Sequence, residues 1–301
     1  MTIRKRITPA ATPEWAATDW NRYARTVRVR GGDVHYVDIG AGPVVVLIHG
    51  LGMSWRMWLP NIYVLARKHR VIAIDLPGFG ASQRLPWRRD LGGHAEVVVE
   101  LLREINGLPA TVVGHSLGAF VAQHVAVLLD TDIDGLLLVS SPESRMGMLR
   151  RLAIVCTLSL LRTLLYPRWL ENRCIKHMRL RKALFGRLVY DTTCLKVTLL
   201  TELSRGYATN GFWRAMHAGL RDPVSLRLGS IRAPTLILAG KNDTLIPPSA
   251  AHRLASAIPY AEVLVWNDVG HAPMLERPTE FNELVENFAT GSALAAGLGG
   301  R

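Results

Sequence analysis

The stretch Thr111-Val112-Val113-Gly114-His115-Ser116-Leu117-Gly118-Ala119 carries an apolar run into a Gly-x-Ser-x-Gly turn and then into a helical pattern. A reversal from strand to helix this tight crowds the side chains two residues before and two residues after the serine. Gly114 and Gly118 therefore have a steric reason to lack a Cβ. The pattern predicts that Ser116 stands at the tip of a sharp bend, as a nucleophilic serine must.

A serine hydroxyl is a weak nucleophile at neutral pH, so a histidine must take its proton and a carboxylate must orient the imidazole. The chain supplies both groups, in the order Ser, Asp, His. Asp243 follows the apolar run 234–239, and His271 follows the apolar run 261–266 and a short loop. Both fall just past expected strand ends, where rigid elements deliver residues to a shared rim. We expect Ser116, Asp243 and His271 to form one site.

The chain resembles an α/β-hydrolase, a serine hydrolase of the esterase or lipase type, over nearly all of residues 25–290. Two further motifs carry the resemblance: His49-Gly50-Leu51-Gly52 and Asp75-Leu76-Pro77-Gly78-Phe79-Gly80, each after an apolar strand. The resemblance implies a mostly parallel sheet with helices on both faces and an inserted helical cap, and the alternation of apolar strands and helical patterns agrees with it. It also implies that the backbone N–H groups of Leu51 and Leu117 form an oxyanion hole. Leu117 opens a helix, whose dipole favours the developing negative charge.

The residues around these motifs have supporting roles in this interpretation. We expect His49 to order the oxyanion loop by hydrogen bonding and His115 to pack beside the nucleophile, not to act as a second base. Asp75 is expected to form a turn at a strand end. Glu143, just after the apolar run 135–141, is the rival for the acid; the Gly-x-x-Asp context favours Asp243.

The chain divides into a core, an insertion and a tail. We predict an α/β-hydrolase core from residues 1–143 and 215–290, because a chain of 301 residues with 49% hydrophobic residues can form one large core. Residues 144–214 break the strand–helix alternation, and relatives insert a lid at this position, so we predict a helical cap there. The Gly-rich residues 291–301 are predicted to be a disordered tail. The segment 26–39 is predicted to form a hairpin at the sheet edge.

Positive charge is concentrated in the predicted cap. Residues 144–214 hold fourteen Lys or Arg and three acidic residues, a net charge of +11 out of +12 for the chain. Such an imbalance points to an anionic partner, and two fit: an anionic phospholipid surface or an acidic carrier protein that bears an acyl group. A solvated surface without a partner is the plain alternative. Nucleic acid is not expected, because no nucleic-acid motif accompanies the charge.

Other features indicate the compartment. The apolar run 152–161 is too short to span a bilayer, which needs roughly 20 apolar residues. The N-terminal residues lack the apolar core of a secretory signal. Three cysteines, Cys156, Cys174 and Cys194, fit a reducing compartment. We predict a cytoplasmic protein, peripheral at the membrane if the cap binds lipid. No metal-ligand spacing occurs, so neither metal nor cofactor is expected.

A serine nucleophile selects acyl chemistry, so carboxylic esters are the leading small-molecule substrates. The alternatives are a thioesterase or esterase for carrier-bound acyl groups, a hydrolase of C–C bonds, and a ligand-binding protein that uses the fold without catalysis. Apolar cap residues suggest a lipophilic acyl or alcohol group. They are Leu152, Ile154, Leu158, Leu160, Leu161, Leu164, Leu165, Phe185, Phe212 and Trp213.

Overall fold

A continuous apolar run, Val44–Ile48, forms strand β3 at the centre of a mixed sheet in the computed structural model. The structure describes residues 13–84, 90–142, 177–207, 211–220 and 227–291. In these residues the strands are β1 (Ala24–Val29), β2 (Gly32–Ile39), β3 (Val44–Ile48), β4 (Arg70–Ile74), β5 (Ala110–His115), β6 (Ile133–Val139), β7 (Thr235–Gly240) and β8 (Ala261–Trp266).

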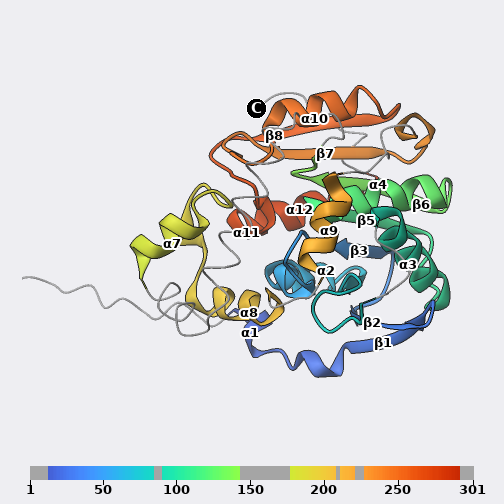
Figure 1. The fold of residues 1–301 in the computed structure, drawn as a ribbon, viewed down its shortest axis with the longest axis horizontal. Helices are drawn as coiled ribbons and strands as arrows, with labels where there is room; N and C mark the ends of the chain where they lie inside the picture. The colour runs from blue at the N-terminus through green and yellow to red at the C-terminus, as the bar shows by residue number, and fades with distance from the viewer. Residues whose placement is uncertain (1–12, 85–89, 143–176, 208–210, 221–226, 292–301) are drawn as a thin grey trace, which may run out of the picture.

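The sheet has the order β1-β2-β4-β3-β5-β6-β7-β8. β1 pairs with β2, and β2 with β4, in antiparallel fashion, while all later neighbours are parallel. Figure 1 shows β1 at one edge and β8 at the other. The chain leaves β3 for β4 on one side and returns to β5 on the other, which makes a switch point between β3 and β5. Ligand crevices in such sheets lie beyond the carboxyl ends of the strands at this point.

Helices cover both faces of the sheet. The helices of the described residues are α1 (Glu14–Ala17), α2 (Leu59–Leu65), α3 (Leu91–Glu104), α4 (Leu117–Leu129), α7 (Met178–Phe185), α8 (Val197–Tyr207), α9 (Phe212–Leu220), α10 (Pro248–Ala255), α11 (Pro273–Glu276) and α12 (Pro278–Ala289). Short 3₁₀ turns are η1 (Trp20–Arg22), η2 (Trp55–Trp58), η3 (Thr192–Cys194) and η5 (Leu228–Ser230).

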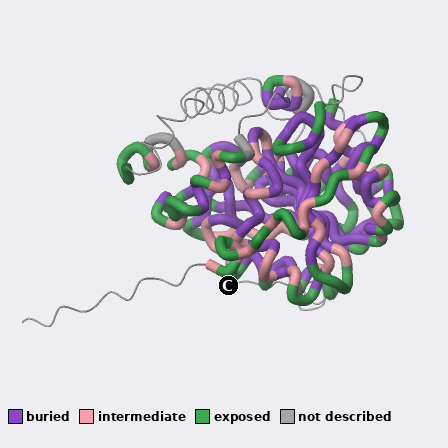
Figure 2. Tube along the Cα trace, turned by 90° about the horizontal axis from the view of Figure 1, so that it is seen from below, coloured by how far each residue is buried: buried purple, intermediate pink, exposed green. Residues whose placement is uncertain are grey.

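Alternate residues of the buried strands feed two apolar clusters. Val46 and Ile48 join the cluster that α3, α4 and α10 cover, whereas Val45 and Leu47 join the cluster under α2 and α12. A strand buried on both faces explains the unbroken apolar run. Figure 2 shows the buried residues gathered in the interior and the exposed residues on the outer turns.

Helix α12 closes the second cluster. Its Phe281 stacks on the fully buried Trp58, with ring centroids 6.0 Å apart. Asn61 Nδ2 donates to Asn282 Oδ1 at 2.9 Å across the same contact. A Cβ on Gly135 of β6 would lie 2.8 Å from Phe288 Cε1, so the ring of Phe288 rests directly on the sheet.

The predicted, mostly parallel sheet with helices on both faces is confirmed. The hairpin predicted over 26–39 is the β1–β2 pair, with β1 at the sheet edge and β4 paired with the other side of β2. Val34 and Tyr36 of β2 are buried in one apolar cluster, and Val37 and Ile39 are buried in the other. Of the predicted cap, the structure describes 177–207 and 211–214, which form α7, η3, α8 and the start of α9. α9 continues past residue 214. Nearly all of the predicted tail lies outside the described residues.

Among the described residues, none of the helices has the length and apolar character needed to cross a bilayer.

Candidate active site

Ser116 occupies a strained turn between β5 and α4. Its backbone has φ +53° and ψ −115°, a conformation that costs a residue with a Cβ about 1–3 kcal/mol. The backbone N–H of Ser116 donates to the carbonyl oxygen of Val139 at 2.9 Å, which fixes the turn to β6. The surrounding structure therefore holds the serine at the carboxyl end of the sheet, beside the switch point.

The two flanking glycines allow this turn. A Cβ on Gly114 would lie 2.4 Å from the carbonyl oxygen of Gly118, as the sequence predicts for residues on either side of the serine. A Cβ on Gly118 would instead lie 2.3 Å from the carbonyl oxygen of Ile48 on β3. The second glycine is thus required by the neighbouring strand, a contact that the sequence does not reveal.

The structure brings Ser116, His271 and Asp243 together from three strand ends. His271 Nε2 lies 3.0 Å from Ser116 Oγ, and His271 Nδ1 lies 2.7 Å from Asp243 Oδ2. Both His271 and Asp243 are buried. Because a carboxylate only accepts hydrogen bonds, Nδ1 carries the proton and the lone pair of Nε2 faces the serine hydroxyl.

Asp243 is itself held by backbone donors. Its Oδ1 accepts from the N–H groups of Leu245 and Ile246, each at 2.8 Å. The carboxylate therefore has one oxygen fixed by its own loop and the other directed at His271. Glu143, the rival acid in the sequence, lies outside the described residues.

The backbone N–H groups of Leu51 and Leu117 follow β3 and β5, which are paired neighbours. Leu117 is the first residue of α4, so its N–H has no acceptor within the helix. Met53 N–H donates to the carbonyl oxygen of Gly50 at 3.2 Å, which makes the tight turn that contains Leu51. Both groups therefore follow the carboxyl ends of adjacent strands, and their role as an oxyanion hole stays a prediction.

His49 connects the Leu51 turn to the next loop. Its Nδ1–H donates to the carbonyl oxygen of Gly50 at 2.8 Å, and its Nε2 accepts from Leu76 N–H at 3.1 Å. Burial lowers the pKa of His49, so the ring stays neutral and can perform both tasks. This is the ordering contact that the sequence led us to expect.

His115 contacts His271 directly. Its Nε2–H donates to the backbone carbonyl oxygen of His271 at 2.8 Å, and the two ring centroids lie 4.9 Å apart. Burial, followed by the proximity of His271, lowers the pKa of His115 well below its usual range. The Nε2 proton thus ties His115 to the backbone of the His271 loop, while Nδ1 is buried without a hydrogen-bond partner among the described residues and lies so close to Gly50 that a Cβ there would be 2.8 Å away. The packing role expected for His115 stays a prediction.

Asp75 has a larger structural role than a local turn. Its side chain accepts from Trp55 N–H at 2.8 Å and from Ala81 N–H at 2.9 Å, and it lies 2.9 Å from His35 Nδ1. These partners come from three separate segments, so the carboxylate joins the loops around β4 and β2. The bond from Ala81 N–H agrees with the expected turn at the end of β4, and the bonds to Trp55 and His35 are additional contacts that turn chemistry does not reveal.

Glu276 is a residue of this neighbourhood that the sequence analysis missed. It ends α11, five residues after His271, and accepts a hydrogen bond from Gly270 N–H at 2.9 Å. The sequence offers only a weak signal, an acidic residue that closes the apolar segment 273–275.

The apolar residues expected to line the cap are only partly described. Seven of the ten lie within residues 143–176, outside the described residues. Of the other three, Phe212 is buried at the start of α9, Phe185 is half-buried and Trp213 is exposed.

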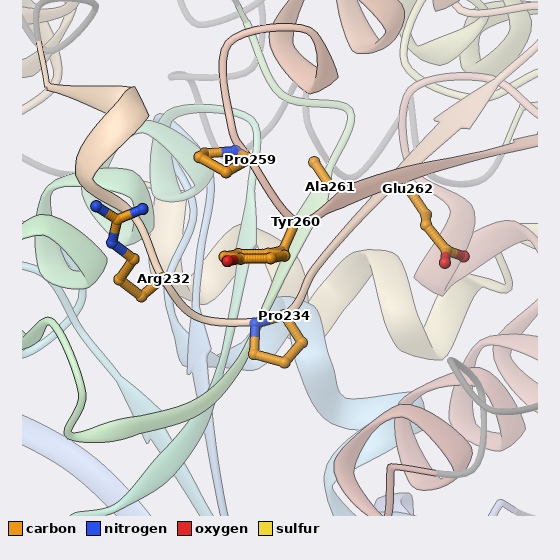
Figure 3. A pocket seen from close by; sticks show the side chains of 6 residues that line it. All are labelled: Arg232, Pro234, Pro259, Tyr260, Ala261 and Glu262. Carbon is orange, nitrogen blue, oxygen red and sulfur yellow. The ribbon is translucent and has the colours of Figure 1, made fainter.

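A separate hollow of about 480 Å³ lies at the starts of β7 and β8, the opposite strand end from Asp243. In Figure 3, Arg232 and Glu262 lie on either side of Tyr260, so their charges do not converge on one point. The hollow is therefore separate from the Ser116 site. Within the described residues, no three His, Cys, Asp or Glu side chains are grouped so that they could hold a metal ion.

Comparisons with known proteins agree with this geometry. Residues 45–284 match the family model described as the alpha/beta hydrolase family. A 2-hydroxy-6-oxononadienedioate/2-hydroxy-6-oxononatrienedioate hydrolase of Pseudomonas putida is 28% identical over 282 residues, which cover 88% of this chain and 96% of that protein.

Solved structures show the same architecture. An N-acyl homoserine lactone degrading enzyme is 26% identical, with a TM-score of 0.67 and coverage of 88% of this chain and 100% of that one. A thermophilic esterase from Thermogutta terrifontis shares the fold at 22% identity, with a TM-score of 0.70 and coverage of 89% and 98%.

Proposed function

Because the chain belongs to the alpha/beta hydrolase family, we propose that it is a serine hydrolase that cleaves carboxylic esters through an acyl intermediate on Ser116. The observation that carries this proposal is the 3.0 Å contact between Ser116 Oγ and His271 Nε2, with Asp243 2.7 Å from the other ring nitrogen. Nucleophile, base and orienting acid are thus aligned as acyl transfer requires.

The proposed reaction has two halves. Ser116 Oγ attacks the ester carbonyl carbon while its proton passes to His271 Nε2, and the resulting oxyanion is bound by the N–H groups of Leu51 and Leu117. The proton then passes from His271 to the departing alcohol, which leaves an acyl group on Ser116. In the second half, His271 takes a proton from water as the water oxygen attacks the acyl carbon. The bond between that carbon and Ser116 Oγ then breaks, the proton on His271 returns to Oγ, and the acid is released.

Hydrolysis of a C–C bond is the second candidate, since the same serine, histidine and acid could support it. The similarity to the 2-hydroxy-6-oxononadienedioate hydrolase favours it, because that substrate carries a ketone in place of an ester carbonyl. We place ester hydrolysis first, because attack by an aligned serine on an ester needs no further group to accept the electrons of a departing carbon.

Hydrolysis of p-nitrophenyl esters from acetate to palmitate, by wild type and Ser116→Ala, tests the proposal. We expect the substitution to lower kcat by about 10⁶-fold. The chain-length optimum would report how lipophilic the acyl pocket is. If wild type and Ser116→Ala release nitrophenol equally slowly from every ester, ester hydrolysis is wrong, and cleavage of a vinylogous diketone is the next assay.

We also propose that the basic cap binds an anionic phospholipid surface. The first turn of α7 exposes apolar and basic side chains side by side: Met178 is 53% and Leu180 40% exposed, and Arg179 and Lys182 are exposed beside them. Figure 1 shows α7 at the periphery, away from the sheet. This mixture favours a lipid surface over an acidic carrier protein, because apolar side chains can enter the acyl boundary while the cations meet headgroup phosphates.

A further inference from the structure

The carboxylate of Glu276 joins two distant segments of the chain. Its Oε1 accepts from Gly270 N–H at 2.9 Å, and its Oε2 accepts from Tyr190 N–H at 2.7 Å. Gly270 immediately precedes His271, whereas Tyr190 belongs to the predicted cap. One side chain therefore connects the cap to the loop that carries the proposed base.

A second contact connects the same two segments. The backbone N–H of His271 donates to the carbonyl oxygen of Leu188 at 3.0 Å. A Cβ on Gly270 would lie 2.7 Å from the backbone nitrogen of Tyr190, so the two backbones touch with no room for a side chain. The segment 188–190 therefore lies directly against the histidine loop.

The surroundings of Glu276 indicate a carboxylate committed to backbone donors. Burial raises its pKa. Backbone N–H groups act in the opposite direction by stabilising the charged form, and they come from both segments: Tyr190 and Asp191 from one, Gly270 and Ala272 from the other. The neighbouring cation Arg277 lies 3.2 Å from Glu280 and also donates to a backbone carbonyl. The hydrogen bonds of Glu276 thus serve the two chain segments.

We propose that Glu276 is a positioning residue that couples the cap segment 188–191 to His271 and so maintains the alignment of His271 with Ser116. This inference rests on the proposed function. A displacement of the base by about 1 Å can cost up to about a hundredfold in rate. The contact of the cap segment 188–191 with the His271 loop therefore controls the position of His271 relative to Ser116.

Glu276→Gln is the test variant, because an amide of the same shape places its NH₂ against one of two N–H donors. Glu280→Gln is the matched control on the adjacent helix, and Tyr190→Ala removes an exposed ring but keeps the backbone N–H. Each variant is compared with wild type in ester hydrolysis, in labelling of Ser116 by a fluorophosphonate, and in hydrogen exchange of the peptides around 188–191 and 268–272.

For Glu276→Gln we expect kcat and the labelling rate to fall about tenfold to a hundredfold, KM to stay within about threefold, and exchange to accelerate in both peptides together. The two controls should match wild type. Faster hydrogen exchange in Glu276→Gln with an unchanged rate of Ser116 labelling would overturn the proposal. So would a loss of kcat that disappears when wild type and all variants are assayed well below their melting temperatures. Failure of the proposed ester hydrolysis is recognised separately, because wild type would then hydrolyse none of the esters, whereas labelling of Ser116 by the fluorophosphonate would still report its alignment with His271.

Discussion

Replacing Asp243 by asparagine is expected to trap His271 in the wrong tautomer. The Oδ1 position accepts two backbone N–H groups at 2.8 Å, from Leu245 and Ile246, so the amide must place its oxygen there and its NH₂ at the Oδ2 position. That NH₂ then faces His271 Nδ1 at about the present 2.7 Å. Two donors cannot face each other, so Nδ1 must lose its proton and Nε2 must gain it.

A proton on Nε2 removes the acceptor for the Ser116 hydroxyl, which lies 3.0 Å away. An enforced wrong tautomer in a serine–histidine–acid site costs about 10⁴ in kcat. This corresponds to about 5 kcal/mol of lost transition-state stabilisation. The fold should be retained, because the substitution keeps the shape of the side chain and its two backbone hydrogen bonds.

The assay is kcat for the best p-nitrophenyl ester, with circular dichroism and thermal unfolding as checks on the fold. Glu143→Gln is the matched control, since Glu143 is the competing acid in the sequence, and it should stay within about threefold of wild type. A folded Asp243→Asn protein within tenfold of wild type would refute the tautomer argument. If Glu143→Gln were the more damaging change, the acid would be Glu143.

Three further predictions follow from the packing, the buried histidines and the cap charge. Gly118→Ala should lower the free energy of unfolding by about 3 kcal/mol or prevent folding, because its Cβ would lie 2.3 Å from a carbonyl oxygen of β3. Gly229→Ala is the control, because its Cβ meets no atom within 4 Å, and it should leave the free energy of unfolding unchanged. Urea titrations measure both. Burial lowers the pKa of His94 from 6.5 to about 4, so below pH 6.5 the unfolded chain binds the proton more readily and stability falls with pH, by about 2 kcal/mol at pH 5. A His94→Leu protein with an unchanged pH dependence of unfolding would contradict this. Binding to phosphatidylglycerol vesicles in a sedimentation assay should weaken with added salt and drop severalfold in the double variant Arg179→Glu/Lys182→Glu. Binding that changes neither with salt nor with the double substitution would leave the carrier-protein or solvated-surface alternatives.

Local patterns were enough to predict the elements that build the site. β3 (Val44–Ile48) is the apolar strand expected before His49, and its unbroken apolar run fits a strand that is buried on both faces. β8 spans the predicted run 261–266, with clear loop residues after Trp266, although it is an edge strand whose residues are at most partly buried. The order of Ser116, Asp243 and His271 at strand ends then predicted that they would meet.

The contacts that the sequence did not predict join segments far apart in the chain. Nothing near Asp75 indicates that Trp55 and His35 bind its carboxylate, and nothing near Glu276 indicates Tyr190 as a partner. These hydrogen bonds depend on how loops pack after the sheet has formed. Propensity and periodicity describe neighbours along the chain, so they cannot supply such partners.

The position of α12 sets the timing of assembly during synthesis. Phe288 rests on Gly135 of β6, and Phe281 stacks on Trp58, so an apolar face of the sheet stays open until α12 has been made. At 5–20 residues per second, the interval between translation of Gly135 and of Phe288 is roughly 10–30 s. The nascent chain carries this face uncovered for that time, long enough for chaperones to bind it. Since His271 is the last of the three site residues along the chain, the site can form only after residue 271 has been made.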